Sequence, residues 1–221
     1  INCVGLLIKD SIINPEKAIY LNSYLPILLE EIAGQNNSKL IHISTDCVFS
    51  GKKKSPYTED DLKDATDMYG LTKNLGEKLS PKSLILRTSI IGPELTKNGT
   101  GLFHWFMSET NIVNGYKQMI WSGVTTLELA KAIKWAINND IVGLYHITNN
   151  LKISKNDLIN LIKLYTKKNI TIIPIKGKNI NKSFIDTRKL LDYKIPSYEE
   201  MVREMVIDIS KSNNIYKHYH L

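Results

Sequence analysis

Two side chains that could transfer a proton stand four residues apart in this sequence. Tyr69 and Lys73 fall in the segment Met68–Lys78, and the hydroxyl residues Ser44 and Thr45 precede them at the end of an apolar run. On a helix, residues i and i+4 share a face, so the phenol and the ammonium can point into one cleft. An adjacent ammonium is expected to lower the pKa of Tyr69 from its usual value of about 10. Tyr69 is therefore a candidate general acid or base, and Thr45 a candidate hydrogen-bond donor to a substrate oxygen that gains charge.

The order of the surrounding elements is more informative than the Tyr-x-x-x-Lys spacing itself. With 11 Tyr and 29 Lys plus Arg among 221 residues, chance alone gives about one such pair. Residues 40–46 are predicted to form a buried strand, residues 65–79 a helix and residues 83–88 the next strand. Strand, loop, helix and strand in this order predict a parallel crossover unit, whose ligands bind at the carboxyl ends of the strands.

Four strings of this sequence, in this order and at these distances, resemble one family. They resemble the extended short-chain dehydrogenase/reductases and, within them, the dTDP-4-dehydrorhamnose reductase group of sugar-nucleotide reductases. The resemblance runs from about residue 1 to about residue 205, and its most specific part is the string that begins at Ser44. The four strings are Ser44–Gly51 (STDCVFSG), Tyr57–Asp60 (YTED), Tyr69–Lys73 (YGLTK) and Leu86–Ser89 (LRTS).

This resemblance implies a site, a cofactor and a substrate. Thr45, Tyr69 and Lys73 match the family's catalytic positions, where Lys73 would also hold the nicotinamide ribose and Tyr69 would protonate the 4-keto oxygen of a deoxyhexulose. The cofactor would be NADPH or NADH, and the partner a nucleotide-diphosphate sugar. The implied cofactor-binding residues are Cys3, Val4, Gly5, Ser44, Tyr69, Lys73, Thr88, Ser89 and Ile90. The implied substrate-binding residues are Asp46, Val48, Phe49, Phe103, Trp105, Trp121 and Arg188.

Several of these residues also have a structural interpretation. Asp46 could orient the substrate or cap its loop, and the aromatic residues of the run 102–107, like Trp121, could be core side chains. Arg188 is either a diphosphate contact or an exposed structural arginine. Arg87 is expected either to form a structural ion pair near the sheet edge or to contact the nicotinamide or the substrate. Asn22 is expected either to have a role in the site or to be a surface amide.

The sequence also departs from the family. A dinucleotide-binding domain opens with a strand, a glycine-rich turn and a helix that faces the pyrophosphate. The twelve glycines of the chain form no such pattern, and residues 1–5 resemble the family's fourth strand instead. About 60 residues, two βαβ units, would then precede them. We therefore expect the 221 residues alone to bind a nicotinamide dinucleotide poorly and to turn over little substrate; submicromolar binding measured by calorimetry would contradict this expectation.

Composition favours a cytoplasmic protein that does not bind nucleic acid. The net charge is +7, but the lysines are dispersed and Lys52–Lys54 is the only triplet; it is either a solvated loop or an attraction for an anionic substrate. The cysteines, Cys3 and Cys47, are too few for a disulfide framework and lack metal-ligand spacing, so no metal is expected. No run approaches the ~18 apolar residues that cross a bilayer, so no membrane partner is expected. A homodimer is a further expectation.

The sequence thus predicts an α/β fold, a Rossmann-like parallel sheet with helices on both faces and with its first strands missing, plus a small α+β substrate-binding lobe. Residues 1–92 would be the remaining part of the NAD(P)-binding domain. Residues 93–221 would be mainly the lobe, with a strand near 144–148 returning to the sheet. Further helices are expected at 15–34, 125–138, 154–165 and 197–210, a short one from Asp186, and a frayed tail after Ser212.

The expected activity is NAD(P)H-dependent reduction of a nucleotide-linked 4-keto-6-deoxy sugar, in the synthesis of a deoxysugar for surface polysaccharide. Two alternatives stay open. The same Tyr and Lys serve sugar-nucleotide epimerases and dehydratases, and Asp46 occupies the place of a dehydratase's extra acid. A non-catalytic regulatory or binding subunit could also use this scaffold.

Overall fold

The computed structural model describes residues 1–53, 56–189, 193–212 and 214–219 of the chain. Its central sheet is parallel throughout, in the order β1-β2-β7. The strands are β1 (Ile41–Thr45), β2 (Leu84–Thr88) and β7 (Gly143–His146). The register places Thr45 opposite Thr88, so the carboxyl ends of β1 and β2 meet at one edge. Of residues 1–5, predicted as a strand, only Asn2 pairs with β1, in an isolated parallel bridge to His42.

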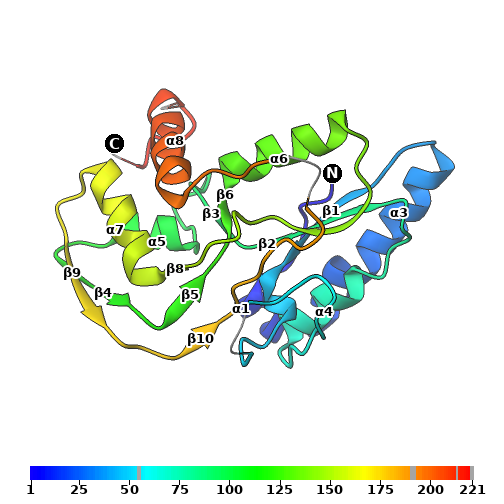
Figure 1. Cartoon of the computed structure of the whole chain (residues 1–221), viewed down its shortest axis with the longest axis horizontal. Helices are drawn as coiled ribbons and strands as arrows, with labels where there is room; N and C mark the ends of the chain where they lie inside the picture. Colours follow the sequence, from blue (N-terminus) through cyan, green and yellow to red (C-terminus); the bar gives the residue numbers. More distant parts are fainter. Residues whose placement is uncertain (54–55, 190–192, 213, 220–221) are drawn as a thin grey trace.

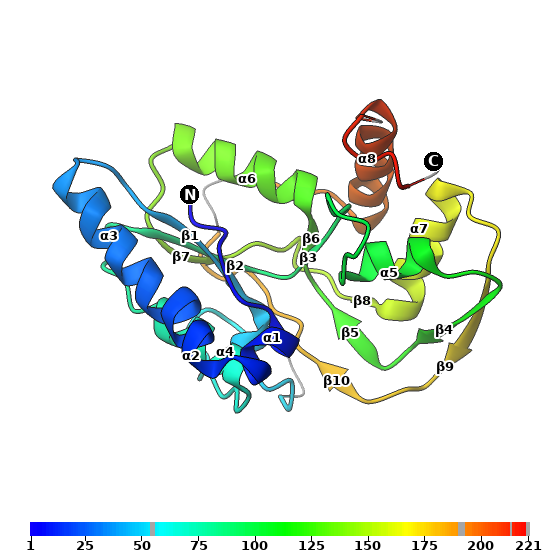
Figure 2. The same ribbon diagram turned by 180° about the vertical axis from the view of Figure 1, so that it is seen from behind.

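Helices cover both faces of this sheet, as the sequence predicts (Figures 1 and 2). One face carries α6 (Thr126–Asn138). Ala132, Ile133 and Ala136 of this helix pack in one core with Leu84 and Leu86 of β2. The opposite face carries a group of helices with these bounds: α1 (Ile8–Ile13), α2 (Pro15–Ala18), the π-helix η1 (Ile19–Tyr24), α3 (Leu25–Gln35) and α4 (Met68–Gly76).

The helix predicted at 15–34 contains a π-helical turn. The structure resolves it into α2, η1 and α3, and Pro26 occupies the first turn of α3. Proline has no N–H to donate to the preceding turn, so it is tolerated where a new helix begins. Asn22 lies inside η1 and is fully buried rather than a surface amide.

A second layer of short strands and helices forms the lobe. Its sheets are β10-β5-β8, β3-β6 and β4-β9. The strands are β3 (Ile90–Ile91), β4 (Ile112–Tyr116), β5 (Met119–Trp121), β6 (Val124–Thr125), β8 (Ile153–Ser154), β9 (Thr171–Ile175) and β10 (Ile180–Asn181). The helices are α5 (Leu102–Ser108), α7 (Lys155–Thr166) and α8 (Tyr198–Lys211). Ser197 and Glu200 form the predicted capping box of α8.

Two predictions about the C-terminal third are wrong. Residues 186–189 are not helical, and the three residues after them lie outside the described residues. The tail is not frayed at Tyr219, which is 4% exposed and packs edge-on against Phe103, with ring centroids 5.3 Å apart. Its hydroxyl also lies 2.7 Å from His104 Nδ1 and accepts the Glu94 N–H. An aromatic side chain with two polar partners anchors the end of the chain to α5.

The overall class is the predicted α/β class, with a parallel sheet between helices. Within the described residues, none of the helices combines the length and the apolar character needed to span a membrane. β7 follows the lobe strands β3–β6 in sequence and pairs with β2, so the chain returns to the central sheet before it builds β8, β9 and β10.

Candidate active site

Thr45 and Tyr69 meet at the carboxyl end of β1. Thr45 is the last residue of the strand, and its hydroxyl accepts the Cys47 N–H at 3.1 Å, which starts the 3-10 helix η2 (Asp46–Val48). Asp67 caps α4 by accepting the Gly70 N–H, so Tyr69 lies in the first turn of that helix. A Cβ on Gly70 would lie 2.3 Å from the Cys47 carbonyl oxygen. Glycine at this position therefore lets α4 approach η2 closely enough for the phenol to reach Thr45.

The electrostatic setting of Tyr69 differs from the prediction. Burial raises the pKa of the Tyr69 phenol, and nearby Cys47 adds to the rise, while the Thr45 hydroxyl opposes it. Lys73 does not lower it, because its ammonium donates to the Ile43 carbonyl oxygen at 2.8 Å and lies 3.4 Å from His42 Nε2. The prediction of a depressed phenol pKa is therefore wrong, and at neutral pH Tyr69 carries its proton.

Lys73 is itself perturbed. It is 4% exposed, and burial lowers its pKa to about 8, against the opposing charge of Glu77 one turn along the helix. The ammonium form still predominates at pH 7. Its attachment to the backbone of β1 fixes α4 against the strand whose end carries Thr45.

A buried ion pair lies behind these residues. The Arg87 guanidinium binds the Glu77 carboxylate in a bidentate manner, with Nε–Oε1 at 2.9 Å and Nη2–Oε2 at 2.7 Å. Both side chains are fully buried. Arg87 is therefore a structural ion-pair residue, the first of its two interpretations. Ser44 donates its hydroxyl hydrogen to Glu77 at 2.5 Å, so that hydrogen is engaged within the protein. The contact of Ser44 with a cofactor stays a prediction.

The other predicted cofactor residues lie along the same edge of the sheet. Cys3, Val4 and Gly5 are exposed, as is Ile90. Thr88 is buried, and its hydroxyl donates to backbone oxygens, among them that of Ile147 at 3.1 Å. Residues 3–5 follow the Asn2 bridge and therefore lie beside β1, whereas Ile90 follows the end of β2.

Asn22 has a structural role. Its Oδ1 accepts the Leu6 N–H at 2.8 Å, and its Nδ2 donates to the Leu6 carbonyl oxygen at 3.1 Å and to Thr72 Oγ1 at 3.1 Å. The amide thus connects the N-terminal segment to α4. Every polar atom of the side chain is engaged with protein, as expected for a buried amide.

Three predicted substrate contacts are core residues instead. Val48 and Phe49 are fully buried in a small cluster with Tyr57 and Phe184, and Phe49 stacks on Tyr57 at 4.2 Å. Phe103 is fully buried in the main core. None of the three has surface to offer a ligand, so these predictions are wrong.

Asp46, Trp105 and Trp121 are the next predicted substrate-binding residues. Trp121 is 7% exposed, and its Nε1–H donates to Ser89 Oγ at 2.9 Å, which joins the lobe to the end of β2. Trp105 is partly buried against the core. Asp46 is partly exposed; burial raises the pKa of its carboxyl, while the Lys182 ammonium opposes that rise.

Two basic residues predicted as possible contacts for an anionic substrate, Arg188 and Lys53, form ion pairs with carboxylates. The Arg188 guanidinium pairs with Asp60 at 2.6 Å and donates to the Leu144 carbonyl oxygen at 2.8 Å. These contacts give Arg188 a structural role, the second of its two interpretations, and its contact with a diphosphate stays a prediction. Of the Lys52–Lys54 triplet, Lys53 pairs with Asp61 at 2.6 Å, Lys52 is exposed, and Lys54 lies outside the described residues.

Sequence reasoning missed Lys155 and Lys182. Both are partly buried, and both lower the pKa of the Asp46 carboxyl, so their charges approach the residue that follows Thr45. Lys182 follows β10 and Lys155 follows β8, and neither short strand is predicted from the sequence. No local pattern could have identified them.

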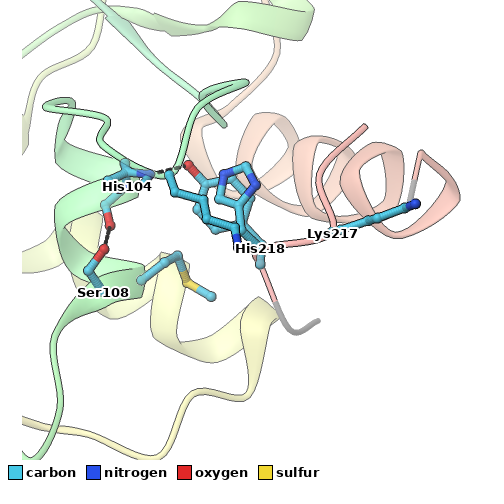
Figure 3. Close-up of a pocket in the computed structure, with 7 residues that line it drawn as sticks. His104, Ser108, Lys217 and His218 are labelled. Atoms are coloured by element: carbon cyan, nitrogen blue, oxygen red, sulfur yellow. Dashed lines mark hydrogen bonds between the residues drawn. The ribbon is translucent and has the colours of Figure 1, made fainter. Parts of the chain in front are cut away.

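A surface cavity of about 370 Å³ lies away from this group, between α5 and the C-terminal tail (Figure 3). Figure 3 shows His104 joined to the tail by its hydrogen bond to Tyr219, while Lys217 extends away from His104 and Ser108. None of the three predicted catalytic residues lines the cavity. His104 is buried and packs against Tyr219.

The chain is similar to known sugar-nucleotide reductases. The family model described as the RmlD substrate binding domain matches residues 13–210. The dTDP-4-dehydrorhamnose reductase of Aggregatibacter actinomycetemcomitans is 48% identical over 65 residues, 28% of this chain and 22% of the relative. That of Salmonella typhimurium is 31% identical over 142 residues, 60% of this chain and 48% of the relative. The matched regions thus span less than half of either relative's length.

Solved structures show the same fold. The dTDP-4-dehydrorhamnose reductase of Bacillus anthracis, determined in complex with NADP, superposes with a TM-score of 0.80 over 93% of this chain and 79% of that one, at 22% identity. At this identity the likeness concerns the fold alone. The family model, by contrast, matches residues 13–210, which is most of the chain. This chain therefore belongs to the RmlD substrate binding domain family.

Proposed function

We propose that this chain carries the catalytic and substrate-binding part of a reductase that uses NADPH or NADH to reduce a nucleotide-linked 4-keto-6-deoxy sugar. The observation that supports this most directly is the contact between the Thr45 hydroxyl and the Tyr69 phenol at the carboxyl end of β1. The Lys73 ammonium binds the Ile43 carbonyl oxygen of the same strand. The curated relatives described above are named dTDP-4-dehydrorhamnose reductases. The reaction would belong to deoxysugar synthesis for surface polysaccharide, in the cytoplasm.

The residues of this edge fit the nicotinamide half of the cofactor. Gly5 is exposed, and a Cβ there would lie 3.2 Å from Asn22 Oδ1 and 4.0 Å from Lys73 Nζ, so glycine keeps the space beside the ammonium open. An ammonium has three hydrogens, and only the Ile43 carbonyl oxygen takes one at short distance. Lys73 would hold the ribose hydroxyls, with the backbone of Thr88, Ser89 and Ile90 alongside. The bound cofactor would supply the hydride.

The protonation state of Tyr69 suits the reductive direction. Because burial raises the pKa of the phenol, the proton that the reduced oxygen requires is present on Tyr69 at neutral pH. Thr45, next to the phenol, can hydrogen-bond the same oxygen as its charge develops. Tyr69 would thus be the general acid, Thr45 the group that orients the ketone, and Lys73 the residue that fixes α4 and the ribose.

The test is an assay of a chimera in which two βαβ units with a glycine-rich turn are joined ahead of Ile1. The protein is incubated with NADPH and, separately, with dTDP- and UDP-linked 4-keto-6-deoxy sugars. Sugar-dependent loss of nicotinamide absorbance supports the proposal, whereas a rearranged sugar without net cofactor change supports an epimerase. Tyr69→Phe is expected to lower turnover by at least ~100-fold, the usual effect of losing a general acid. Tyr20→Phe, at an exposed tyrosine, is the matched control; equal turnover in both variants would exclude Tyr69 from the mechanism.

A further inference from the structure

His42 lies between two side chains that both donate hydrogen bonds. It is fully buried on β1, and within the described residues each nitrogen of its ring has one polar neighbour. Nδ1 lies 3.2 Å from Asn2 Nδ2, and Nε2 lies 3.4 Å from Lys73 Nζ. The orientation of the Asn2 amide is fixed, because its Oδ1 accepts the Val4 N–H at 3.0 Å. The imidazole is therefore held between two donors, of which only Lys73 can lose a proton near neutral pH.

A neutral imidazole has one hydrogen, so it cannot accept from both neighbours at once. The His42 ring is neutral, because burial and next the charge of Lys73 lower its pKa to about 3. While Lys73 is an ammonium, Nε2 accepts from it, and the ring hydrogen stays on Nδ1, where it faces the Asn2 donor. When Lys73 is an amine, its lone pair accepts the Nε2–H, and Nδ1 accepts from Asn2. Only the amine form gives all three side chains a partner of the right kind.

The other groups around Lys73 act on the same balance. Burial lowers the pKa of Lys73 to about 8, while Glu77 of the same helix and Cys3 of the N-terminal segment oppose this fall. The Glu77 carboxylate also acts on His42 and opposes the fall of its pKa. The Ile43 carbonyl oxygen, 2.8 Å from Lys73 Nζ, can accept a hydrogen from the ammonium and from the amine alike. The contact that distinguishes the two forms of Lys73 by hydrogen bonding is therefore the one with the imidazole.

We propose that Asn2 and His42 are positioning residues that set the protonation of Lys73: when Lys73 loses its charge, the imidazole hydrogen moves from Nδ1 to Nε2 and stabilises the amine. In this step Lys73 gives one proton to Nε2 and Nδ1 releases one, so the pair of side chains loses a single proton to water. The inference rests on the proposed function only for its consequence there. The ammonium would donate to the ribose hydroxyls of the cofactor, whereas the amine would accept from one of them.

Nitrogen-15 NMR of the 221-residue chain, without cofactor or sugar, tests this inference between pH 6 and pH 10. The ring nitrogen shifts show which nitrogen of each histidine carries the hydrogen, and the side-chain nitrogen shift of Lys73 follows its titration. We expect the His42 hydrogen to move from Nδ1 to Nε2 with the same midpoint as Lys73, at about pH 8. His146 is the internal control, because its Nδ1 donates to the Ile185 carbonyl oxygen at 2.9 Å and its Nε2 accepts from Arg87 at 2.7 Å. Its hydrogen should stay on Nδ1 throughout.

Four variants separate the hydrogen bond from the charge. Lys73→Arg keeps a charged donor at every pH and should hold the His42 hydrogen on Nδ1, whereas Lys73→Met should hold it on Nε2. Asn2→Asp keeps an oxygen for the Val4 N–H and places an acceptor beside Nδ1. It should hold the hydrogen on Nδ1 throughout and raise the pKa of Lys73 by about one unit. Cys3→Asp adds the same charge at the next residue, so it should also raise the pKa of Lys73 but leave the movement of the hydrogen in place.

Two results would overturn the inference: a His42 hydrogen that stays on one nitrogen while Lys73 titrates, or a movement of that hydrogen that persists in Lys73→Met. The unmodified chain alone decides the first point, so the test does not depend on the folding of any variant, which urea denaturation checks. Because the titration contains no cofactor and no ketone, its outcome is separate from that of the reductase assay. A coupled titration of His42 and Lys73 without any reduction would refute the proposed reaction and leave this inference standing.

Discussion

Replacing Glu77 by glutamine should destabilise the fold more than any surface ion-pair change. The Glu77 carboxylate neutralises Arg87, which is fully buried, and approaches the Lys63 ammonium at 3.3 Å. Glu77→Gln keeps the shape but leaves a buried guanidinium without a counter-charge, which costs about 3–5 kcal/mol. For a chain of this size that corresponds to a fall in Tm of about 10 °C. The same carboxylate accepts the Ser44 hydroxyl, so the variant also loosens the strand end that carries Thr45.

Urea and thermal denaturation followed by circular dichroism measure this effect. The matched control is Asp140→Asn, which breaks the pair between Lys39 and an aspartate side chain that is 91% exposed. An exposed pair contributes at most about 1 kcal/mol, so this control should hardly move the transition. The double variant Glu77→Met/Arg87→Met removes both charges together and should recover much of the loss. Equal transitions for Glu77→Gln and Asp140→Asn would refute the argument that the buried charge determines the cost.

Two other predictions concern pH and helix packing. Burial, and next the charge of Lys73, lower the pKa of His42 from 6.5 to about 3. Below pH 6.5 the unfolded chain therefore binds a proton at His42 that the folded chain does not, and the free energy of unfolding should fall toward acid by up to about 1.4 kcal/mol per pH unit. In urea denaturation at pH 7, 6 and 5, His42→Gln should show a smaller change of this free energy with pH. An unchanged pH dependence would contradict the role given to His42. Gly70→Ala should destabilise the chain and separate Tyr69 from Thr45, because its Cβ would lie 2.3 Å from a backbone oxygen. Gly34 lies in a helix, and a Cβ built on it would meet no atom within 4 Å, so Gly34→Ala should instead stabilise the folded chain by about 0.5–1 kcal/mol. If the denaturation midpoints of both alanine variants moved in the same direction, the close approach of Gly70 to Cys47 would be excluded as the cause of the destabilisation.

The elements that carry the catalytic trio could be predicted from local sequence. The apolar run before Thr45, the capped helix around Tyr69 and the run before Thr88 each hold enough periodicity to fix type and order, and the structure places their boundaries within a few residues. Strand alternation could also have separated Ser44 from Thr45, since neighbouring residues of a strand face opposite sides. That signal predicts only that the Ser44 hydroxyl faces away from the Thr45 hydroxyl; its partner, Glu77, is known only from the structure.

Other features depend on contacts between distant segments. The aromatic run of α5 gives no local indication of which rings enter the core. In the structure Phe103 and Phe106 do, and Tyr219 packs edge-on against Phe103. The pKa of Tyr69 depends mainly on how deeply the surrounding elements bury the phenol, which no local pattern indicates. Lys182 becomes part of the site only through the pairing of β10 with β5. Short strands of two or three residues leave no pattern from which such pairing could be inferred.

The path of the chain between sheet and lobe has a consequence for unfolding. The chain builds β1 and β2, leaves for β4 and β5, returns as β7 beside β2, and leaves again for β8, β9 and β10. Neither layer can therefore be excised as one continuous stretch, and cutting the connection on either side of β7 would damage both. We expect sheet and lobe to melt in a single cooperative transition, with the catalytic edge lost at the same temperature as the lobe.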